Sequence, residues 1–304
     1  MTDLELHEFY ENLVRTLRTK GVLCAITSGL ACVHYGIAES TKDCDLLCHP
    51  SSFGTLLDLL RETKVDGSMC QYRGSLSPPL DVRWHQGGWT SHFEWPGHEG
   101  VMLDVFGSAL REASPWQEET QGLYAGLQVV AYMKRTDREK DWPFINLIGE
   151  QMLLRQDARG WLHIYEAELL LELAARNEIP DEMIGKRPLL KLAREGSEEL
   201  RFALNAERAY WRELDHLRIR ILRTALRPYA AAVGKAIQGF AGELSEQHRL
   251  RMQLAGAHLD PHPLGTFGLE RYVERARENT LRGISGPLAK WLPDVAEHFR
   301  RFAQ

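Results

Sequence analysis

Residues 26–48 read ITSGLACVHYGIAESTKDCDLLC, and this stretch decides how the first part of the chain folds. An apolar run ends at the pair Ser28-Gly29, and a second apolar run carries Asp43 and Asp45. Alternate side chains of a strand point to the same face, so we expect the two carboxylates to project together. Neighbouring carboxylates repel each other unless a cation lies between them, and oxygen ligands at this spacing suit Mg²⁺ or Mn²⁺.

The residues around this stretch predict an α/β opening that continues into a mixed sheet. Apolar residues recur at helical spacing over residues 4–20, and Gly21 ends that helix. Residues 67–106 alternate short apolar runs with Gly, Ser and Pro, which is typical of strands joined by hairpins. We therefore expect strands at residues 22–26, 44–48, 69–73, 80–84, 92–95 and 101–106, with helices at residues 30–35 and 52–61.

From residue 117 onward the chain reads as almost wholly helical. Pro228 is expected to end the longest helix, because proline lacks a backbone N–H. The periodic segments are residues 127–135, 137–155, 161–176, 181–194, 198–226, 229–240, 243–255, 269–277 and 287–302. The predicted fold class is α+β, with a mixed sheet and flanking helices in residues 1–155 and a mostly α-helical domain in residues 156–304.

Charge is distributed unevenly over the 304 residues. The chain carries a net charge of −5, which does not suggest general coating by nucleic acid. Residues 200–304 contain 17 Lys and Arg against 11 Asp and Glu, whereas residues 1–199 contain 20 against 31. This asymmetry fits a metal site beside a surface for an anionic partner, and it equally fits solvated helices that differ in charge.

The five cysteines and the absence of long apolar runs indicate a cytoplasmic protein. None of the cysteines forms a Cys-x-x-Cys pair, so a zinc site is not expected, and their apolar neighbours favour reduced, buried thiols. The first residues do not resemble a signal peptide, and no apolar run approaches the ~20 residues that span a bilayer. We therefore expect no membrane partner.

The pair Ser28-Gly29, a short helix and Asp43-Cys-Asp45 together resemble the nucleotidyltransferase superfamily. That superfamily includes DNA polymerase beta, antibiotic nucleotidyltransferases and toxins of the AbiEii type. The toxin-like branch often has a further glycine and then Arg-x-Thr-x-Asp-x-Asp, whereas this chain has Glu39 where the arginine is expected. The resemblance covers roughly the first half of the chain and implies a nucleotidyltransferase-type sheet. The alternative is a surface turn whose aspartates cap a strand.

A two-metal phosphoryl-transfer site needs a third carboxylate on a neighbouring strand. Asp104 is an isolated acid in the apolar run Val-Met-Leu-Asp-Val-Phe, and burying a lone carboxylate is unfavourable unless it is paired or bound to metal. Asp81 is the rival, but Arg83 two residues later offers it an ion pair. We favour Asp104.

Lys134 ends a predicted helix, and a Lys-Asp pair, Lys140-Asp141, follows it. The resemblance implies that Lys134 neutralises triphosphate charge and that Asp141 orients Lys134 or the nucleotide. Lysine is a common phosphate ligand, which supports that role. The alternative is a solvated helix junction with internal salt bridges.

Two further groups of side chains have competing interpretations. The aromatic and histidine side chains between residues 84 and 95 would either line a substrate pocket or pack a hairpin against the core. The arginines between residues 212 and 227 would form either an RNA-binding stripe or a solvated helix face. The first comprises His85, His92, Trp84, Trp89 and Trp95, and the second comprises Arg212, Arg218, Arg220, Arg223 and Arg227.

The resemblance implies a metal-dependent nucleotidyltransferase that moves a nucleoside monophosphate from a nucleoside triphosphate to an acceptor hydroxyl and releases pyrophosphate. Asp43, Asp45 and Asp104 would be the catalytic, metal-binding residues, and Ser28, Gly29 and Lys134 would bind the nucleotide. The acceptor would be a small molecule, an RNA such as tRNA, or a protein, and an antitoxin partner is consistent with the toxin-like branch. The alternative is a catalytically silent nucleotidyltransferase fold that binds a nucleotide or a partner, which Glu39 favours.

Overall fold

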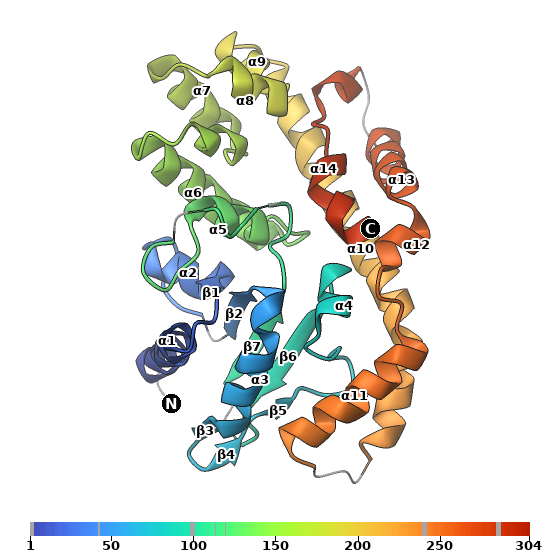
Figure 1. The fold of residues 1–304 in the computed structure, drawn as a ribbon. Helices are drawn as coiled ribbons and strands as arrows, with labels where there is room; N and C mark the ends of the chain where they lie inside the picture. Colours follow the sequence, from blue (N-terminus) through green and yellow to red (C-terminus); the bar gives the residue numbers. More distant parts are fainter. Residues whose placement is uncertain are drawn as a thin grey trace.

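A computed structural model describes residues 3–41, 43–97, 101–112, 114–118, 120–238, 242–283 and 287–304. The architecture is α+β, with a mixed five-stranded sheet in the first part and a mostly helical second part (Figure 1). The sheet order is β1 (Cys24–Thr27), β2 (Asp43–Cys48), β7 (Met102–Phe106), β6 (Thr90–Glu94) and β5 (Gln71–Tyr72). Strands β2 and β7 are parallel neighbours, and the other three strand pairs of this sheet are antiparallel.

One face of the sheet is apolar and buried. Cys44, Leu46 and Cys48 of β2 belong to the same buried cluster as residues of two helices, α1 (Asp3–Thr19) and α3 (Phe53–Glu62). Because side chains alternate along a strand, the opposite face of β2 carries Asp43 and Asp45. The predicted core strand with outward carboxylates is therefore confirmed.

The first part matches most of the predicted elements. The predicted strand at residues 69–73 is divided between β4 and β5, which belong to different sheets, β3 was not predicted, and the largest difference lies at residues 80–84. The predicted strand there is wrong, because these residues enter a helix, α4 (Val82–Gln86). Asp81 is its N-cap, and the Asp81 carboxylate accepts a hydrogen bond of 3.0 Å from the Arg83 N–H. The remaining elements of this part are α2 (Ser28–His34), η1 (Pro50–Ser52), β3 (Lys64–Val65) and β4 (Ser68–Met69), with β3 and β4 forming a separate two-stranded sheet.

The second part is built almost wholly from helices. In the described ranges, no helix is both long and apolar enough to cross a membrane. The elements are α5 (Leu127–Lys134), η2 (Glu139–Asp141), α6 (Trp142–Leu154), η3 (Ala158–Leu162), α7 (Ala167–Arg176), α8 (Asp181–Lys186), α9 (Leu190–Arg194), α10 (Leu200–Ala236), α11 (Leu244–His258), α12 (Pro263–Phe267), α13 (Leu269–Arg282), η4 (Leu288–Trp291), α14 (Ala296–Phe299) and η5 (Arg300–Ala303).

The predicted end of the long helix at Pro228 is wrong. Helix α10 is 37 residues long and continues through this proline to Ala236, although proline inside a helix costs about 3 kcal/mol. Tyr229 and Val233, which follow Pro228, are fully buried in one apolar cluster, and their burial offsets this cost. The predicted continuation to residue 240 ends outside the described residues.

Helix α10 runs along the molecule from α9 to the neighbourhood of α11 (Figure 1). Helix α11 then returns to the sheet, where His248 Nδ1 lies 2.7 Å from the Tyr72 hydroxyl of β5. Gln247 Oε1 accepts a 3.1 Å hydrogen bond from the Tyr72 N–H. Residues far apart in sequence therefore close one edge of the sheet.

Candidate active site

A row of polar side chains crosses the outward face of the sheet. Thr27 of β1 is paired with Asp45 of β2, Asp45 with Asp104 of β7, and Asp104 with His92 of β6. Residues paired in register present their side chains on the same side of a sheet. Asp43 lies two residues before Asp45, on this same face and one step nearer the beginning of β2. The predicted position of Asp104, on a strand beside Asp-x-Asp, is confirmed.

Asp45 is the electrostatic centre of this row. The pKa of Asp45 is raised from its ordinary value of 3.8 to about 6 by burial, with the charges of Asp104 and Asp43 adding to the effect. A hydrogen bond from the Ser28 hydroxyl and the charge of Lys134 act in the opposite direction. The site therefore holds more negative charge than its surroundings stabilise.

The Ser28-Gly29 turn places the Ser28 hydroxyl at Asp45. Ser28 has a φ of 56°, a left-handed conformation that is uncommon for a residue with a side chain. Such backbone strain is found preferentially at functional sites. A Cβ atom on Gly29 would lie 2.6 Å from Thr41 Oγ1, so this glycine is needed for the close approach of Thr41.

Asp104 is held through one of its two carboxylate oxygens. Arg73 Nη2 donates a 2.8 Å hydrogen bond to Oδ1, and His92 Nδ1 lies 2.8 Å from the same oxygen. Arg73 Nη2 also lies 3.2 Å from His92 Nδ1. In the described part of the chain, no hydrogen bond or ion pair uses Asp104 Oδ2, so this oxygen remains available to a ligand.

Lys134 lies at the end of α5 that faces the acids. Its side chain is mostly buried, and Nζ lies 3.7 Å from Asp141 Oδ1. Asp141 Oδ2 accepts hydrogen bonds from Arg138 and from the Thr136 hydroxyl. Asp141 therefore pairs with Lys134, a contact that fits both the resemblance and the alternative of internal salt bridges at a helix junction.

The other candidate residues of the sequence lie elsewhere. Asp81 caps α4 and is not part of the row, so it is excluded as the third carboxylate. His85 is buried against Ser91, and burial lowers its pKa to about 3. The three tryptophans of this group, Trp84, Trp89 and Trp95, are buried, as the packing alternative expects. Of this group, only His92 reaches the acids.

Two residues of the site, Arg73 and Thr27, carried no recognisable sequence signal. Arg73 directly follows β5, and 17 residues separate β5 from β6. The residue that Arg73 contacts therefore depends on how these two strands pair. Thr27 simply ends the apolar strand before Ser28. Neither residue belongs to a sequence motif from which its contact in the folded protein could be predicted.

The side chains of this face have the chemistry to bind a divalent cation, although they do not converge around a single point. Among the described residues, no group of three or more His, Cys, Asp or Glu side chains converges closely enough to hold a metal ion. Three features nevertheless favour a cation: the raised pKa of Asp45, the unused oxygen of Asp104, and the Thr27 hydroxyl, which is fully buried without a hydrogen-bond partner. Oxygen-only donors of this kind suit Mg²⁺ or Mn²⁺.

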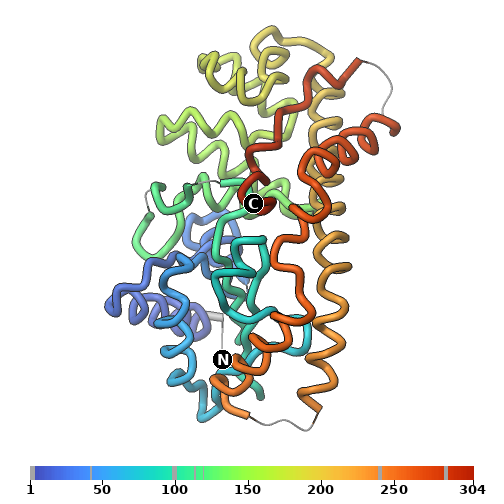
Figure 2. The backbone as a smooth tube through the Cα atoms, turned by 45° about the vertical axis from the view of Figure 1, so that its right-hand side comes forward, coloured from blue at the N-terminus to red at the C-terminus, as the bar shows by residue number. Residues whose placement is uncertain are grey.

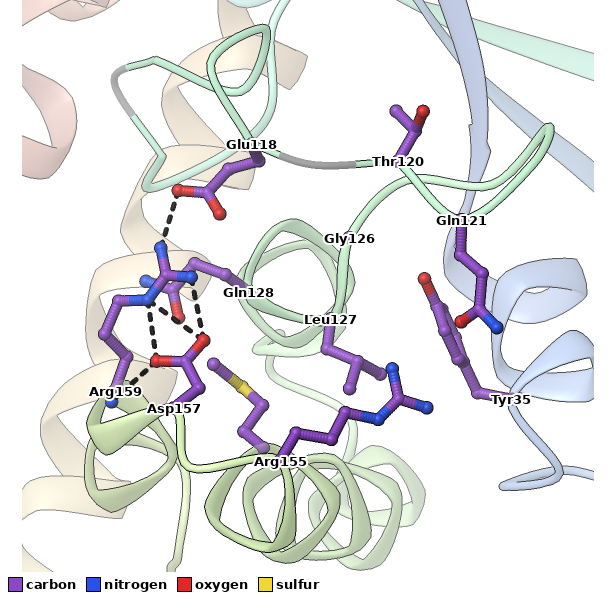
Figure 3. A pocket seen from close by; sticks show the side chains of 11 residues that line it. Tyr35, Glu118, Thr120, Gln121, Gly126, Leu127, Gln128, Arg155, Asp157 and Arg159 are labelled. Atoms are coloured by element: carbon purple, nitrogen blue, oxygen red, sulfur yellow. Dashed lines mark hydrogen bonds and ion pairs between the residues drawn. The ribbon is translucent and has the colours of Figure 1, made fainter.

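A separate pocket of about 340 Å³ lies at the opposite end of α5 from Lys134 (Figure 3). On one side, Arg159 is paired with Asp157 and Glu118. On the other, the Arg155 guanidinium lies 5.6 Å from the centre of the Tyr35 ring. None of the carboxylates on the polar row lines this pocket, so it is distinct from the acidic face.

In comparisons with known proteins, no family model matches the chain, and no curated protein or solved structure matches it significantly. The resemblance to nucleotidyltransferases therefore stays a prediction from the sequence. The geometry of the polar face carries the functional assignment.

Proposed function

We propose that this chain is a metal-dependent nucleotidyltransferase that moves a nucleoside monophosphate from a nucleoside triphosphate to an acceptor hydroxyl. The observation that carries the proposal is the register of Asp45 with Asp104 on adjacent parallel strands, with Asp43 on the same face. Burial, with the charges of Asp104 and Asp43 adding to it, raises the pKa of Asp45, so a cation beside Asp45 would stabilise its ionised form. The strained Ser28 beside these carboxylates adds support.

Each group has a role in such a reaction. Asp43, Asp45 and Asp104 would hold the cation, which when bound offsets charge on the phosphates. Ser28 and Gly29 would lie along the nucleotide, and Lys134 would neutralise phosphate charge. The acceptor oxygen bonds to the α-phosphorus, the bond from that phosphorus to the bridging oxygen breaks, and pyrophosphate leaves with the electron pair. The hydroxyl proton passes to Asp104 and then to solvent.

Two measurements test this activity. Thermal unfolding with each nucleoside triphosphate, with and without Mg²⁺, identifies the nucleotide, because a ligand that binds only the folded state raises its stability. Incubation of the protein and Mg²⁺ with cell extract and a triphosphate labelled on its α-phosphate then identifies the acceptor. We expect a labelled acceptor and release of pyrophosphate. A protein that neither binds a triphosphate with Mg²⁺ nor labels any acceptor would contradict the proposal.

Arg73 should be important for cation affinity although it touches no substrate. It fixes Asp104 through Oδ1, and loss of a residue that orients a metal ligand typically lowers affinity about 10–100-fold. We expect Arg73→Met to weaken Mn²⁺ binding by that order in a calorimetric titration with a non-hydrolysable triphosphate. Arg83→Met is the matched control, because the Arg83 guanidinium is exposed and lies over Trp84. Equal affinities in the two variants would contradict the positioning role.

A catalytically silent binding module is the second candidate. It is favoured by the contacts of Asp104 with Arg73 and His92, which already compensate its charge without a cation. Glu39, which is exposed and stands where the toxin-like pattern has arginine, points the same way. This candidate predicts triphosphate binding without any transfer, so the labelling experiment separates the two.

A further inference from the structure

A groove between α10 and the pair α12 and α13 is lined by three arginines and one aspartate. Figure 2 shows α12 and α13 alongside the long α10. The groove has a volume of about 490 Å³, within the range of ordinary ligand pockets. Its floor is apolar and includes Leu217, Ile221 and Phe267, and its rim carries Arg220, Arg271 and Arg275.

These three arginines are exposed and lack acidic partners. None of them forms an ion pair with a carboxylate in the described ranges, whereas Arg282 on the same helix pairs with Glu278. Asp260 also lines the groove, but its Oδ1 already accepts a hydrogen bond from the His262 N–H. Like charges gathered without counter-charges create a local positive potential that attracts an anion.

Helix α13 contributes charged side chains to two grooves. Arg271 and Arg275, one helical turn apart, face the groove against α10. Glu270, Glu274 and Arg277 line a different groove, on the side of α14, and Arg271 lines that groove as well. To the groove against α10, α13 therefore contributes two arginines and no carboxylate.

The positive charge continues along α10 beyond the groove. Arg220, Arg223 and Arg227 are spaced three and four residues apart, which places them along one side of the helix over about 10 Å. Residues 216–236 contain no Asp or Glu. A small, compact anion would use the groove alone, whereas an extended polyanion would use this stripe as well.

We propose that this groove and stripe bind a single-stranded nucleic acid. Unpaired bases offer flat apolar surfaces for the floor, where Phe267 already stacks with the Arg271 guanidinium at 4.8 Å. The phosphates would lie along the arginines of α10 and α13. A groove of this volume admits one or two splayed bases but no base-paired helix. Binding here requires no activity at the acidic site.

The test uses fluorescein-labelled oligouridine and oligothymidine with the full chain, measured by fluorescence anisotropy at several salt concentrations. We expect wild-type binding that weakens steeply between about 50 and 200 mM salt. Arg271→Gln/Arg275→Gln should weaken it about tenfold and lower the salt slope by about 1.4, since each phosphate contact on a single strand contributes roughly 0.7. Both substitutions of this double variant replace exposed residues, and circular dichroism checks that the variant folds.

The matched control is Arg277→Gln/Arg282→Gln, which removes the same charge from the other sides of α13. We expect it to bind like the wild type, and preference for RNA or for DNA would each support the site. The proposal is overturned by no wild-type binding at the lowest salt, or by equal weakening in the two double variants. Displacement of the oligonucleotide by polyglutamate at equal charge concentration would also overturn the proposal. Binding would then depend on negative charge alone and not on the bases.

Discussion

Asp45→Asn should abolish nucleotidyl transfer while leaving the protein folded. The substitution keeps the size of the side chain and its capacity to accept a hydrogen bond from Ser28, but it removes the negative charge that a cation requires. Transfer of the α-phosphate label should fall by several orders of magnitude, because cation and triphosphate then bind without the central ligand. Lys134→Ala should lose less, on the order of 1.5–3 kcal/mol in transition-state stabilisation, since it removes a single phosphate contact.

Asp58→Asn is the matched control for the loss of one carboxylate. Asp58 is exposed on α3, and its ion pair within the described part of the chain is with Arg61, at 3.5 Å. We expect transfer at the wild-type rate in this variant. Residual transfer by Asp45→Asn equal to that of Asp58→Asn would contradict the role of Asp45.

The same Asp45→Asn variant should be more stable than the wild type when no cation is bound. Because the pKa of Asp45 is raised to about 6 on folding, the folded protein binds more protons than the unfolded chain between about pH 4 and pH 6. Stability is therefore highest below this window and is lost as the pH rises through about 6. At neutral pH, removing the charge should stabilise the metal-free fold by on the order of 1–3 kcal/mol. Urea unfolding at about pH 4 and pH 8 measures the difference, which should be large at pH 8 and nearly absent at pH 4.

Arg187→Met should be the most destabilising single substitution considered, by about 3–5 kcal/mol. Arg187 is almost fully buried, and its Nη2 lies 2.8 Å from Glu207 Oε2. Its Nη1 donates hydrogen bonds of 2.8 Å to the carbonyls of Trp161 and Ile164. Methionine fills the space but leaves the Glu207 charge buried without its cation, with the 3.3 Å hydrogen bond from Trp211 Nε1 remaining. Urea unfolding should show the loss directly.

Lys186→Met controls for position, because Lys186 precedes Arg187 and pairs with the exposed Glu182 at 2.7 Å. Exposed pairs contribute about 0–1 kcal/mol, so this variant should unfold almost like the wild type. Arg187→Met/Glu207→Gln should recover part of the lost stability, because it removes the stranded charge. A loss of less than about 1 kcal/mol in Arg187→Met would contradict the assignment of this ion pair.

The local part of the fold could be predicted because its signals lie close together in the chain. The apolar run before Ser28, the two aspartates at alternate positions and the isolated Asp104 each define a strand and its faces. The helix break at Pro228 was predicted wrongly because local propensity took no account of Tyr229 and the buried cluster around it. Tertiary packing overrides propensity where the apolar area buried is large enough.

The rest of the site depends on strand register, which no short motif specifies. Arg73 meets Asp104 only because β5 and β6 pair across a 17-residue connection that contains α4. Arg187 likewise sits beside Lys186 and before a proline, in a segment that reads as solvated, yet it is buried on Glu207. Such contacts join residues that are far apart in the sequence, so no periodic pattern of residues predicts them.

The position of a bound cation tests the central claim most directly. Crystals grown with Mn²⁺ and a non-hydrolysable nucleoside triphosphate would give an anomalous signal that locates the metal. We predict a peak between Asp43, Asp45 and Asp104, with oxygens at about 2.0–2.4 Å and a phosphate of the nucleotide as a further ligand. A bound nucleotide without metal at these carboxylates, or manganese only at another site, would contradict the assignment of this face as the catalytic centre.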